Sequence, residues 1–154
     1  MQTQNLNIEF GGRTYAGFSF DSLPLDAALL AAALQVDQAA DQARRAVLGD
    51  PLRAVEYRMT ADEAESFAAA GYAGEVPTTV QAWMDASGLD AQAATESILH
   101  ESRAWKGVIY AIRAERLKGK QDVLKAASHE QAEALADVAI AAIKACIQGV
   151  GNAA

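Results

Sequence analysis

The chain has 154 residues, of which 51 % are apolar and 21 % charged, and its formal net charge is −7. Its 36 alanines against 10 aromatic residues favour closely packed helices over a bulky β core, because alanine is the best helix former and fills little volume. The acidic balance argues against a uniform nucleic-acid-binding surface, and the high apolar share argues against disorder. The single cysteine, Cys146, excludes an internal disulfide framework and fits a reducing compartment.

The N-terminal segment, residues 1–22, is predicted to form a β-hairpin appendage. Two short runs that alternate apolar and polar residues flank Gly11-Gly12, a pattern typical of a tight hairpin turn. Four of the ten aromatic residues lie here: Phe10, Tyr15, Phe18 and Phe20. Because an isolated hairpin is only marginally stable in water, we expect it to pack against another surface.

The second segment, residues 23–89, is predicted to be helical. A long helix begins after the capping pattern at 21–24 and ends at 49–51, where a proline disfavours helical geometry in the residue before it. Residues 52–59 can be read as helix or as irregular structure. The buried face of the long helix is predicted to consist of Leu25, Leu29, Ala33, Val36, Ala40, Ala43 and Val47.

Two short helices are predicted next within this segment. Thr60 and Glu63 form the pattern of a capping box, which predicts the start of a helix that runs to Ala70. A further helix is expected to start at Pro77 and to end at Gly88. It carries Val80, Trp83 and Met84.

The third segment, residues 90–154, is predicted to form a long antiparallel helical hairpin, so the expected fold is mainly α. Asp90 is the predicted N-cap of the first helix, and Gly119 is expected to weaken this helix near its end. Residues 128–131 form a second capping box, which predicts the start of the last helix. His129 is expected to be exposed there. Residues 149–152 are expected to end the last helix. The first helix carries a heptad-like stripe of Ile98, Ser102, Trp105, Ile109, Ile112 and Arg116. The last is expected to bury Leu135, Val138, Ala142, Ile143 and Ile147.

No pattern in the sequence predicts catalysis, and we expect no catalytic residue, no cofactor and no metal. Each of the two histidines lacks the second histidine four residues later that a zinc protease motif requires. Cys146 lies in an apolar helical run and is predicted to be a buried thiol. Neither a phosphate-binding loop nor a dinucleotide-binding fingerprint is present. The N-terminus shows no secretory signal, and no uncharged apolar run is long enough to span a membrane.

Positive charge concentrates in residues 103–125, which hold seven basic and two acidic residues. One interpretation is a solvated helical face that balances the acidic N-terminal part. A docking surface for an acidic partner and a nucleic-acid site are the alternatives, the last disfavoured by the net charge of the whole chain. Trp83 and Trp105 are expected to be core anchors.

Residues 36–148 resemble a known family, and three stretches carry the resemblance. The first is 36–45, with the sequence VDQAADQARR, and the second is 54–64, AVEYRMTADEA. A loop with Val76-Pro77 and the stretch VQAW at 80–83 follow the second. The third joins a Trp-bearing helix at Trp105 to the basic run RLKGK at 116–120, and an Ala-rich terminal helix ends the match. In this arrangement the chain resembles the tail-fibre assembly proteins, or fibre chaperones, of bacteriophages and prophages. Family members usually carry Lys where this chain has Met59.

The resemblance implies a chaperone that acts in the host cytoplasm and is in some systems retained on the virion tail. It would bind the distal or C-terminal part of a tail fibre or receptor-binding protein and assist its folding or trimerisation. Such β-rich clients expose strand edges while they fold. Self-association stays open, and neither nucleic acid nor membrane is an expected partner.

The predicted partner-binding residues are Phe10, Tyr15, Phe18 and Phe20, because these aromatics concentrate in a segment too small to be its own core. Two other functions stay open: a structural virion subunit of the baseplate or fibre, and a small acidic regulatory binding protein.

Overall fold

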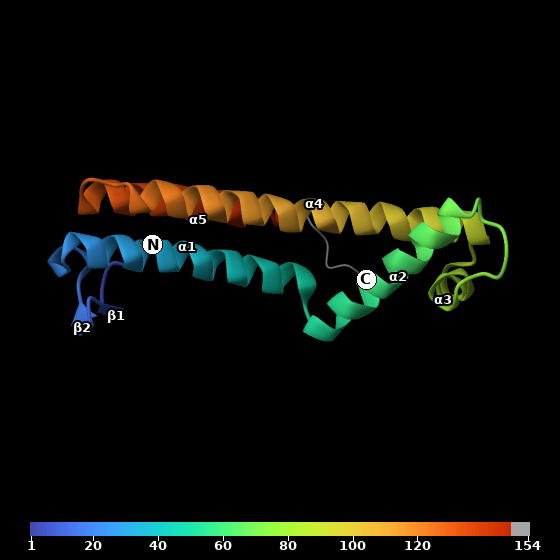
Figure 1. The fold of residues 1–154 in the computed structure, drawn as a ribbon, viewed down its shortest axis with the longest axis horizontal. Coiled ribbons are helices and arrows are strands. Elements are labelled where there is room, and N and C mark those ends of the chain that lie inside the picture. Colours follow the sequence, from blue (N-terminus) through green and yellow to red (C-terminus); the bar gives the residue numbers. More distant parts are fainter. Residues whose placement is uncertain (149–154) are drawn as a thin grey trace. The chain divides into compact units, whose positions relative to one another are not determined.

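The computed structural model describes residues 1–148, and their fold is mainly α, as predicted (Figure 1). Among these residues an antiparallel hairpin and a short 3-10 turn precede five α-helices. The elements are β1 (Leu6–Phe10), β2 (Arg13–Phe18), η1 (Phe20–Ser22), α1 (Leu25–Leu48), α2 (Pro51–Ala69), α3 (Thr78–Ser87), α4 (Ala91–Leu124) and α5 (His129–Ala145). The helix end expected at 149–152 lies outside the described residues.

The chain divides into two compact units whose borders differ from those of the three predicted segments. The described part of unit 1 is Met1–Ala46 and 109–148, and that of unit 2 is Val47–Val108. The border falls inside α4, so this helix contributes its first half to unit 2 and its second half to unit 1. Among the described residues, unit 1 therefore contains three α-helical parts: α1, the second half of α4, and α5.

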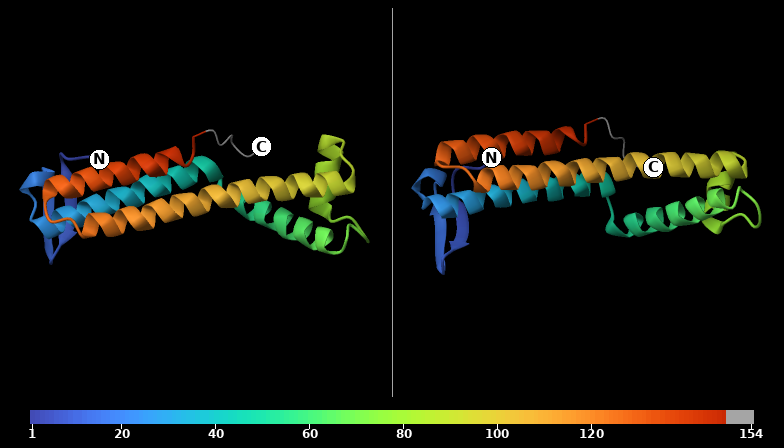
Figure 2. Two further views of the ribbon diagram at one scale, coloured as in Figure 1. Left: turned by 90° about the horizontal axis from the view of Figure 1, so that it is seen from above. Right: turned by 45° about the horizontal axis from the view of Figure 1, so that its top comes forward.

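Unit 1 is a bundle in which α1, α5 and the second half of α4 run side by side (Figure 2). Every position of the predicted α1 face is buried except Leu25, which is half-buried. Much of this interior is alanine, whose small side chain lets helix backbones approach closely. The buried alanines of α1 are Ala27, Ala28, Ala31, Ala32, Ala33, Ala39, Ala40 and Ala43.

Gly119 is buried in α4 where this helix meets α5. A Cβ atom added to Gly119 would overlap the Cβ of Ala139 and lie 3.5 Å from Cγ1 of Val36. The glycine therefore makes room for the neighbouring helix. The sequence predicted only that Gly119 weakens the helix near its end. It did not predict this role in helix packing.

The buried face of α5 differs from the predicted one. Ile143 is buried as expected, but Val138 is 69 % exposed and Leu135 only half-buried. The prediction for Val138 is wrong because the close contact with Gly119 is made by Ala139, and the adjacent Val138 lies about 100° away around the helix. The buried positions are Ala132, Ala136, Ala139 and Ile143.

The start of α5 is capped as predicted, but His129 is not the exposed residue that the sequence suggests. Ser128 Oγ accepts a hydrogen bond from the backbone N–H of Gln131 at 3.2 Å. His129 is half-buried, and its Nε2 donates to the carbonyl oxygen of Leu23 at 2.9 Å. The imidazole also meets the ring of Phe20 edge-on, at a centroid distance of 5.6 Å. His129 thus joins the start of α5 to the turn that precedes α1.

A single helix, α2, covers the stretch that the sequence left open between helix and irregular structure. Its start is capped by Asp50, whose Oδ1 accepts the backbone N–H of Leu52 at 2.8 Å. Since α2 continues without a break, Thr60 lies in its interior. The helix start predicted at Thr60 and Glu63 is therefore wrong.

Glu63 caps a different helix, α3. Its Oε2 accepts hydrogen bonds from the backbone N–H and the hydroxyl of Thr79, at 3.3 and 2.6 Å. The N-cap position of α3 is Pro77, whose side chain makes no capping bond. The carboxylate of Glu63 takes over that role and also faces the positive end of the helix dipole.

The core of unit 2 lies where α2, α3 and the first half of α4 meet. α3 ends at Gly88, in the left-handed conformation with φ of 71°, as predicted. Asp90 caps α4 as predicted, with its Oδ1 accepting the N–H of Ala93 at 2.8 Å. Trp83 and Trp105 are both half-buried. The core consists of Ala64, Val80, Ala94 and Leu99, packed against Ala68, Val76, Trp83, Met84 and Ile98.

Candidate partner-binding surfaces

Three aromatic residues of the hairpin lie on the face that packs against the rest of unit 1. Leu6 and Ile8 are buried, and they pair in register with Phe18 and Tyr15. Directly paired residues of antiparallel strands point to the same side of the sheet. Phe18 is 38 % exposed, Tyr15 and Phe10 are half-buried, and the rings of Tyr15 and Phe18 meet edge-on at 5.4 Å. The face is thus buried at one edge and open at the other.

A bulge at Gly17 brings two of these rings together. Tyr15 and Phe18 are three residues apart, a spacing that places side chains on opposite faces of a regular strand. Gly17 has no partner in the register and a φ of 75°, and its N–H donates to Oδ1 of Asn7 at 3.0 Å. The extra residue turns Phe18 to the side of Tyr15. Strand alternation alone would not have found this arrangement.

Phe20, the fourth predicted partner residue, belongs to the core of unit 1. It lies in η1, it is 1 % exposed, and it packs on His129. A partner would have to unfold this end of the unit to reach it. The hairpin surface therefore consists of Phe10, Tyr15 and Phe18 alone.

The first half of α2 is a second candidate surface, which the sequence analysis did not single out. No residue from Leu52 to Thr60 is buried. Leu52, Val55 and Met59 are 72 %, 56 % and 56 % exposed. Their spacing of three and four residues places them on one side of the helix. We call these three residues the α2 stripe, and a soluble helix rarely leaves such a row uncovered.

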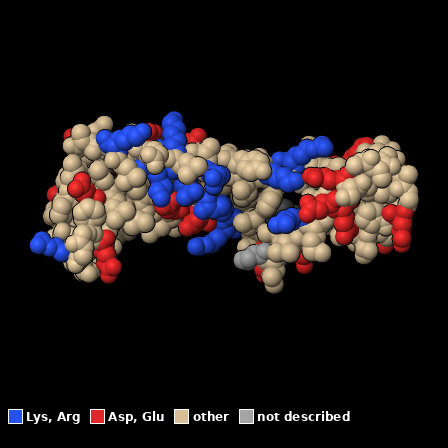
Figure 3. Space-filling view, in the orientation of Figure 1, with Lys and Arg blue, Asp and Glu red and all other residues tan. Residues whose placement is uncertain are grey.

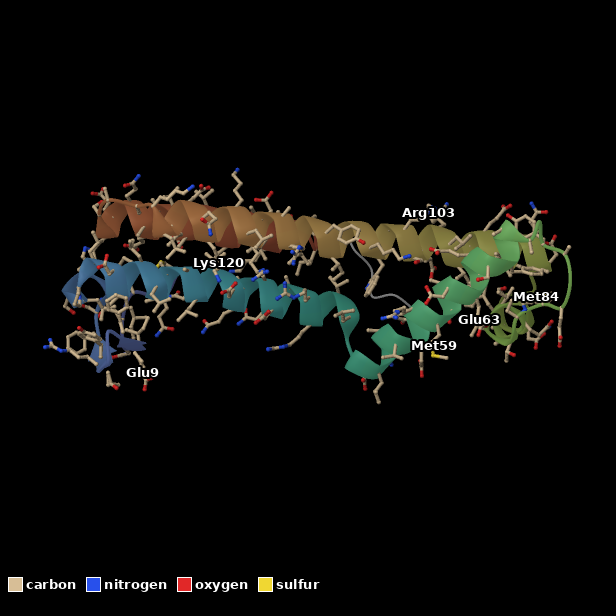
Figure 4. All side chains as sticks on the ribbon, in the orientation of Figure 1. Glu9, Met59, Glu63, Met84, Arg103 and Lys120 are labelled. Carbon is tan, nitrogen blue, oxygen red and sulfur yellow. The ribbon has the colours of Figure 1, made fainter. Side chains whose placement is uncertain are left out.

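The α2 stripe lies in a strongly acidic unit. Residues 47–108 hold four basic and ten acidic residues, a net charge of −6. Figure 3 shows Asp and Glu gathered over this unit, and Figure 4 shows Met59 on the outer side of α2 and Glu63 directed toward α3. The charges nearest the α2 stripe are mixed, with Arg53 and Arg58 beside Glu56 and Asp62, although the unit as a whole is acidic.

Part of the basic stretch serves an ion cluster inside unit 1. Arg116 Nη1 and Lys120 Nζ of α4 donate to the two carboxylate oxygens of Asp37 on α1, at 2.9 and 2.5 Å. Lys120 is labelled in Figure 4. Burial alone would raise the pKa of Asp37, but the hydrogen bonds from Lys120 and Arg116 outweigh it and hold the pKa below 3.8. These two cations are structural, which leaves Arg113, Lys118 and Lys125 of unit 1 for other roles.

We expect Asp37→Asn to lower the free energy of unfolding by about 1–2 kcal/mol near neutral pH, because it removes charge-assisted hydrogen bonds from a partly buried site. A lowered folded-state pKa stabilises the protein above 3.8, and that stability is lost as the pH falls through the folded-state value. The difference between variant and wild type should therefore shrink in acid. Urea unfolding across the acidic range measures it, with the exposed Glu9→Gln as the control. A difference that stays constant with pH would contradict this role of Asp37.

Cys146, predicted to be a buried thiol, is half-buried at the C-terminal end of α5. Burial raises the pKa of the Cys146 thiol and the charge of Glu115 raises it further, so the thiolate that a nucleophile needs is disfavoured. Residues 1–148 contain no group of three or more His, Cys, Asp or Glu that could hold a metal ion. None of the helices described in this part of the chain is both long and apolar enough to cross a membrane.

No family model matches the chain, and neither a curated protein nor a solved structure does. Any inference about function therefore rests on the hairpin surface and the α2 stripe.

Proposed function

We propose that the protein is a non-enzymatic chaperone of bacteriophage tail-fibre assembly, which binds the distal or C-terminal part of its fibre and assists folding or trimerisation. The observation that carries the proposal is the α2 stripe, three large apolar side chains on a stretch of helix with no buried residue. One of them, Val55, lies within 54–64, a stretch on which the resemblance to fibre chaperones rests, whereas Met59 stands in that stretch where family members usually carry Lys.

The α2 stripe suits a client that is not yet folded. Apolar side chains on an exposed helix cover apolar surface without requiring a fixed partner geometry, and the thioether of Met59 adapts its shape easily. The negative charge of unit 2 would keep several bound complexes apart in solution. The hairpin surface, with Tyr15 and Phe18, offers a second contact for a β-rich client. We propose that the protein acts in the host cytoplasm. A chaperone that stays bound to its fibre would also be retained on the virion tail.

The proposal is tested by co-expression with the product of the adjacent upstream open reading frame, taken as the candidate fibre. We expect the wild-type chain to raise the soluble fraction of the fibre and to co-elute with it in size-exclusion chromatography. The triple variant Leu52→Gln/Val55→Gln/Met59→Gln should weaken the complex at least about tenfold, because each buried apolar side chain contributes about 1.5–3 kcal/mol. Glutamine keeps the helix propensity, so the helical circular dichroism should not change.

Leu89→Gln is the matched control, because Leu89 is a 39 % exposed leucine of the same unit outside α2. It should leave the complex intact. A wild-type chain that neither solubilises the fibre nor binds it would overturn the proposal. A triple variant that binds as well as wild type would show that the α2 stripe is not the binding surface.

A further inference from the structure

The second half of α4 exposes three large apolar side chains, while Ile112 and Val123 of the same half are buried in unit 1. Tyr110 is 67 % exposed, and Leu117 and Leu124 are each 43 % exposed. They recur every seven residues, and a step of seven rotates the side chain by only about 20° around a helix. The three therefore form one narrow line along α4. Sequence analysis missed it because the stripe of 98–116 on the other side of α4 is the stronger pattern.

Only cations flank this line on the exposed side of α4. Arg113 and Lys118 are exposed, as is Lys125 directly after the last residue of α4, whereas Glu115 and Asp122 are half-buried. At about 100° per residue, both acids lie roughly 140–160° around the helix from the apolar line. In Figure 3, Lys and Arg gather over unit 1, in contrast to the acidic unit 2. We call the apolar line and its flanking cations the α4 outer face: Tyr110, Arg113, Leu117, Lys118, Leu124 and Lys125.

We propose that the α4 outer face binds an amphipathic α-helix with acidic flanks, supplied by a partner protein. A line with one large apolar residue every two turns supplies one of the two core positions that each heptad contributes to the seam between two packed helices. Basic residues beside the seam pair with acidic residues of the partner helix and thereby select it. This site is separate from the α2 stripe, so it does not depend on the proposed function.

Two other occupants fit the α4 outer face less well. In a second copy of the chain, pairing α4 with α4 would bring its flanking cations together, and like charges across a seam are unfavourable. An anionic membrane requires a broader apolar face than one line of residues, and the net charge of −7 opposes approach to it. The charges therefore favour a heterologous acidic helix.

The test measures binding of a synthetic helical peptide by fluorescence anisotropy. The peptide has about three heptads, with Leu at the a and d positions and Glu at the flanking e and g positions. We expect saturable binding that weakens as salt is added. A peptide with Lys in place of every Glu should bind at least about tenfold more weakly, because it places like charges across the seam.

Two pairs of variants locate the binding site. Leu117→Gln/Leu124→Gln should weaken binding at least about tenfold, and Val138→Gln, at a still more exposed apolar residue on α5, should not change it. Arg113→Gln/Lys118→Gln should reduce both the affinity and its salt dependence, and Lys144→Gln should change neither. The charge variants keep the test valid if the leucine variant fails to fold.

Several results would overturn the proposal. They are no binding of the acidic peptide, equal binding of the basic peptide, binding unaffected by both double variants, self-association through α4 in sedimentation, and capture by vesicles of anionic lipid in place of the peptide. The fibre co-expression is scored separately. Loss of peptide binding with fibre solubilisation intact would leave the proposed function standing.

Discussion

Gly119→Ala is expected to destabilise the protein by about 1–3 kcal/mol, although alanine in place of glycine normally stabilises a helix by about 1 kcal/mol. The added Cβ would overlap the Cβ of Ala139, which is fixed to the backbone of α5 and has no rotamer to move into. The two helices would have to separate and leave gaps along the alanine interior of unit 1. Thermal or urea unfolding measures the loss.

Gly107 provides the matched control within the same helix. A Cβ at this exposed position meets nothing within 4 Å, so Gly107→Ala should stabilise the protein by about 0.5–1 kcal/mol. The reciprocal change Ala139→Gly, introduced together with Gly119→Ala, should restore part of the lost stability because it reopens the contact. Stabilisation by Gly119→Ala, similar to that by Gly107→Ala, would show that α4 and α5 do not pack through this residue.

Phe20→Ala is expected to cost about 3–5 kcal/mol, since it empties a fully buried ring site and removes the partner of His129. Phe18→Ala should cost far less, because more than a third of that side chain is already exposed. Chemical unfolding of both variants gives the comparison. Equal and small losses would mean that Phe20 is not part of the core.

The same pair of residues separates folding from binding at the hairpin. If the hairpin contacts the fibre, Tyr15→Ser/Phe18→Ser should weaken the fibre complex while the helical circular dichroism remains that of wild type. Phe20→Ala should lower stability first and affect the complex only through loss of the folded protein. A stable Tyr15→Ser/Phe18→Ser variant with undiminished binding would limit the client contact to α2.

The sequence predicted those features of the fold that depend on local signals. The face of α1 follows from apolar residues at helical spacing, and six of its seven predicted positions are buried. The caps at Asp90 and Ser128 and the end of α3 at Gly88 follow from residue types that satisfy free backbone groups.

Features that depend on tertiary contacts did not follow from the pattern. Val138 is larger and more apolar than its neighbours on α5, yet the close helix contact buries alanine instead. The burial of Phe20 depends on His129, which lies more than a hundred residues away in sequence. Glu63 has the spacing of a local cap but acts on α3. In each case a distant segment overrides the local preference.

The candidate site was predictable only in part. The aromatic composition of the hairpin pointed to Tyr15 and Phe18, but the bulge at Gly17 that brings them together is set by its unpaired position in the register and by the side chain of Asn7. The α2 stripe escaped notice because a mixed sequence at 52–59 gives no clear helical period. Its exposure becomes visible only when the helix is seen to continue from Pro51 to Ala69.

Amide hydrogen exchange of the chain in complex with its fibre tests the central claim most directly. Residues 52–60 have no buried side chain in the free chain and should therefore exchange quickly. The claim that the α2 stripe holds the client predicts a marked slowing of exchange over 52–60 on complex formation, with little change in the already packed α1. A complex that forms while exchange over 52–60 stays as fast as in the free chain would contradict it.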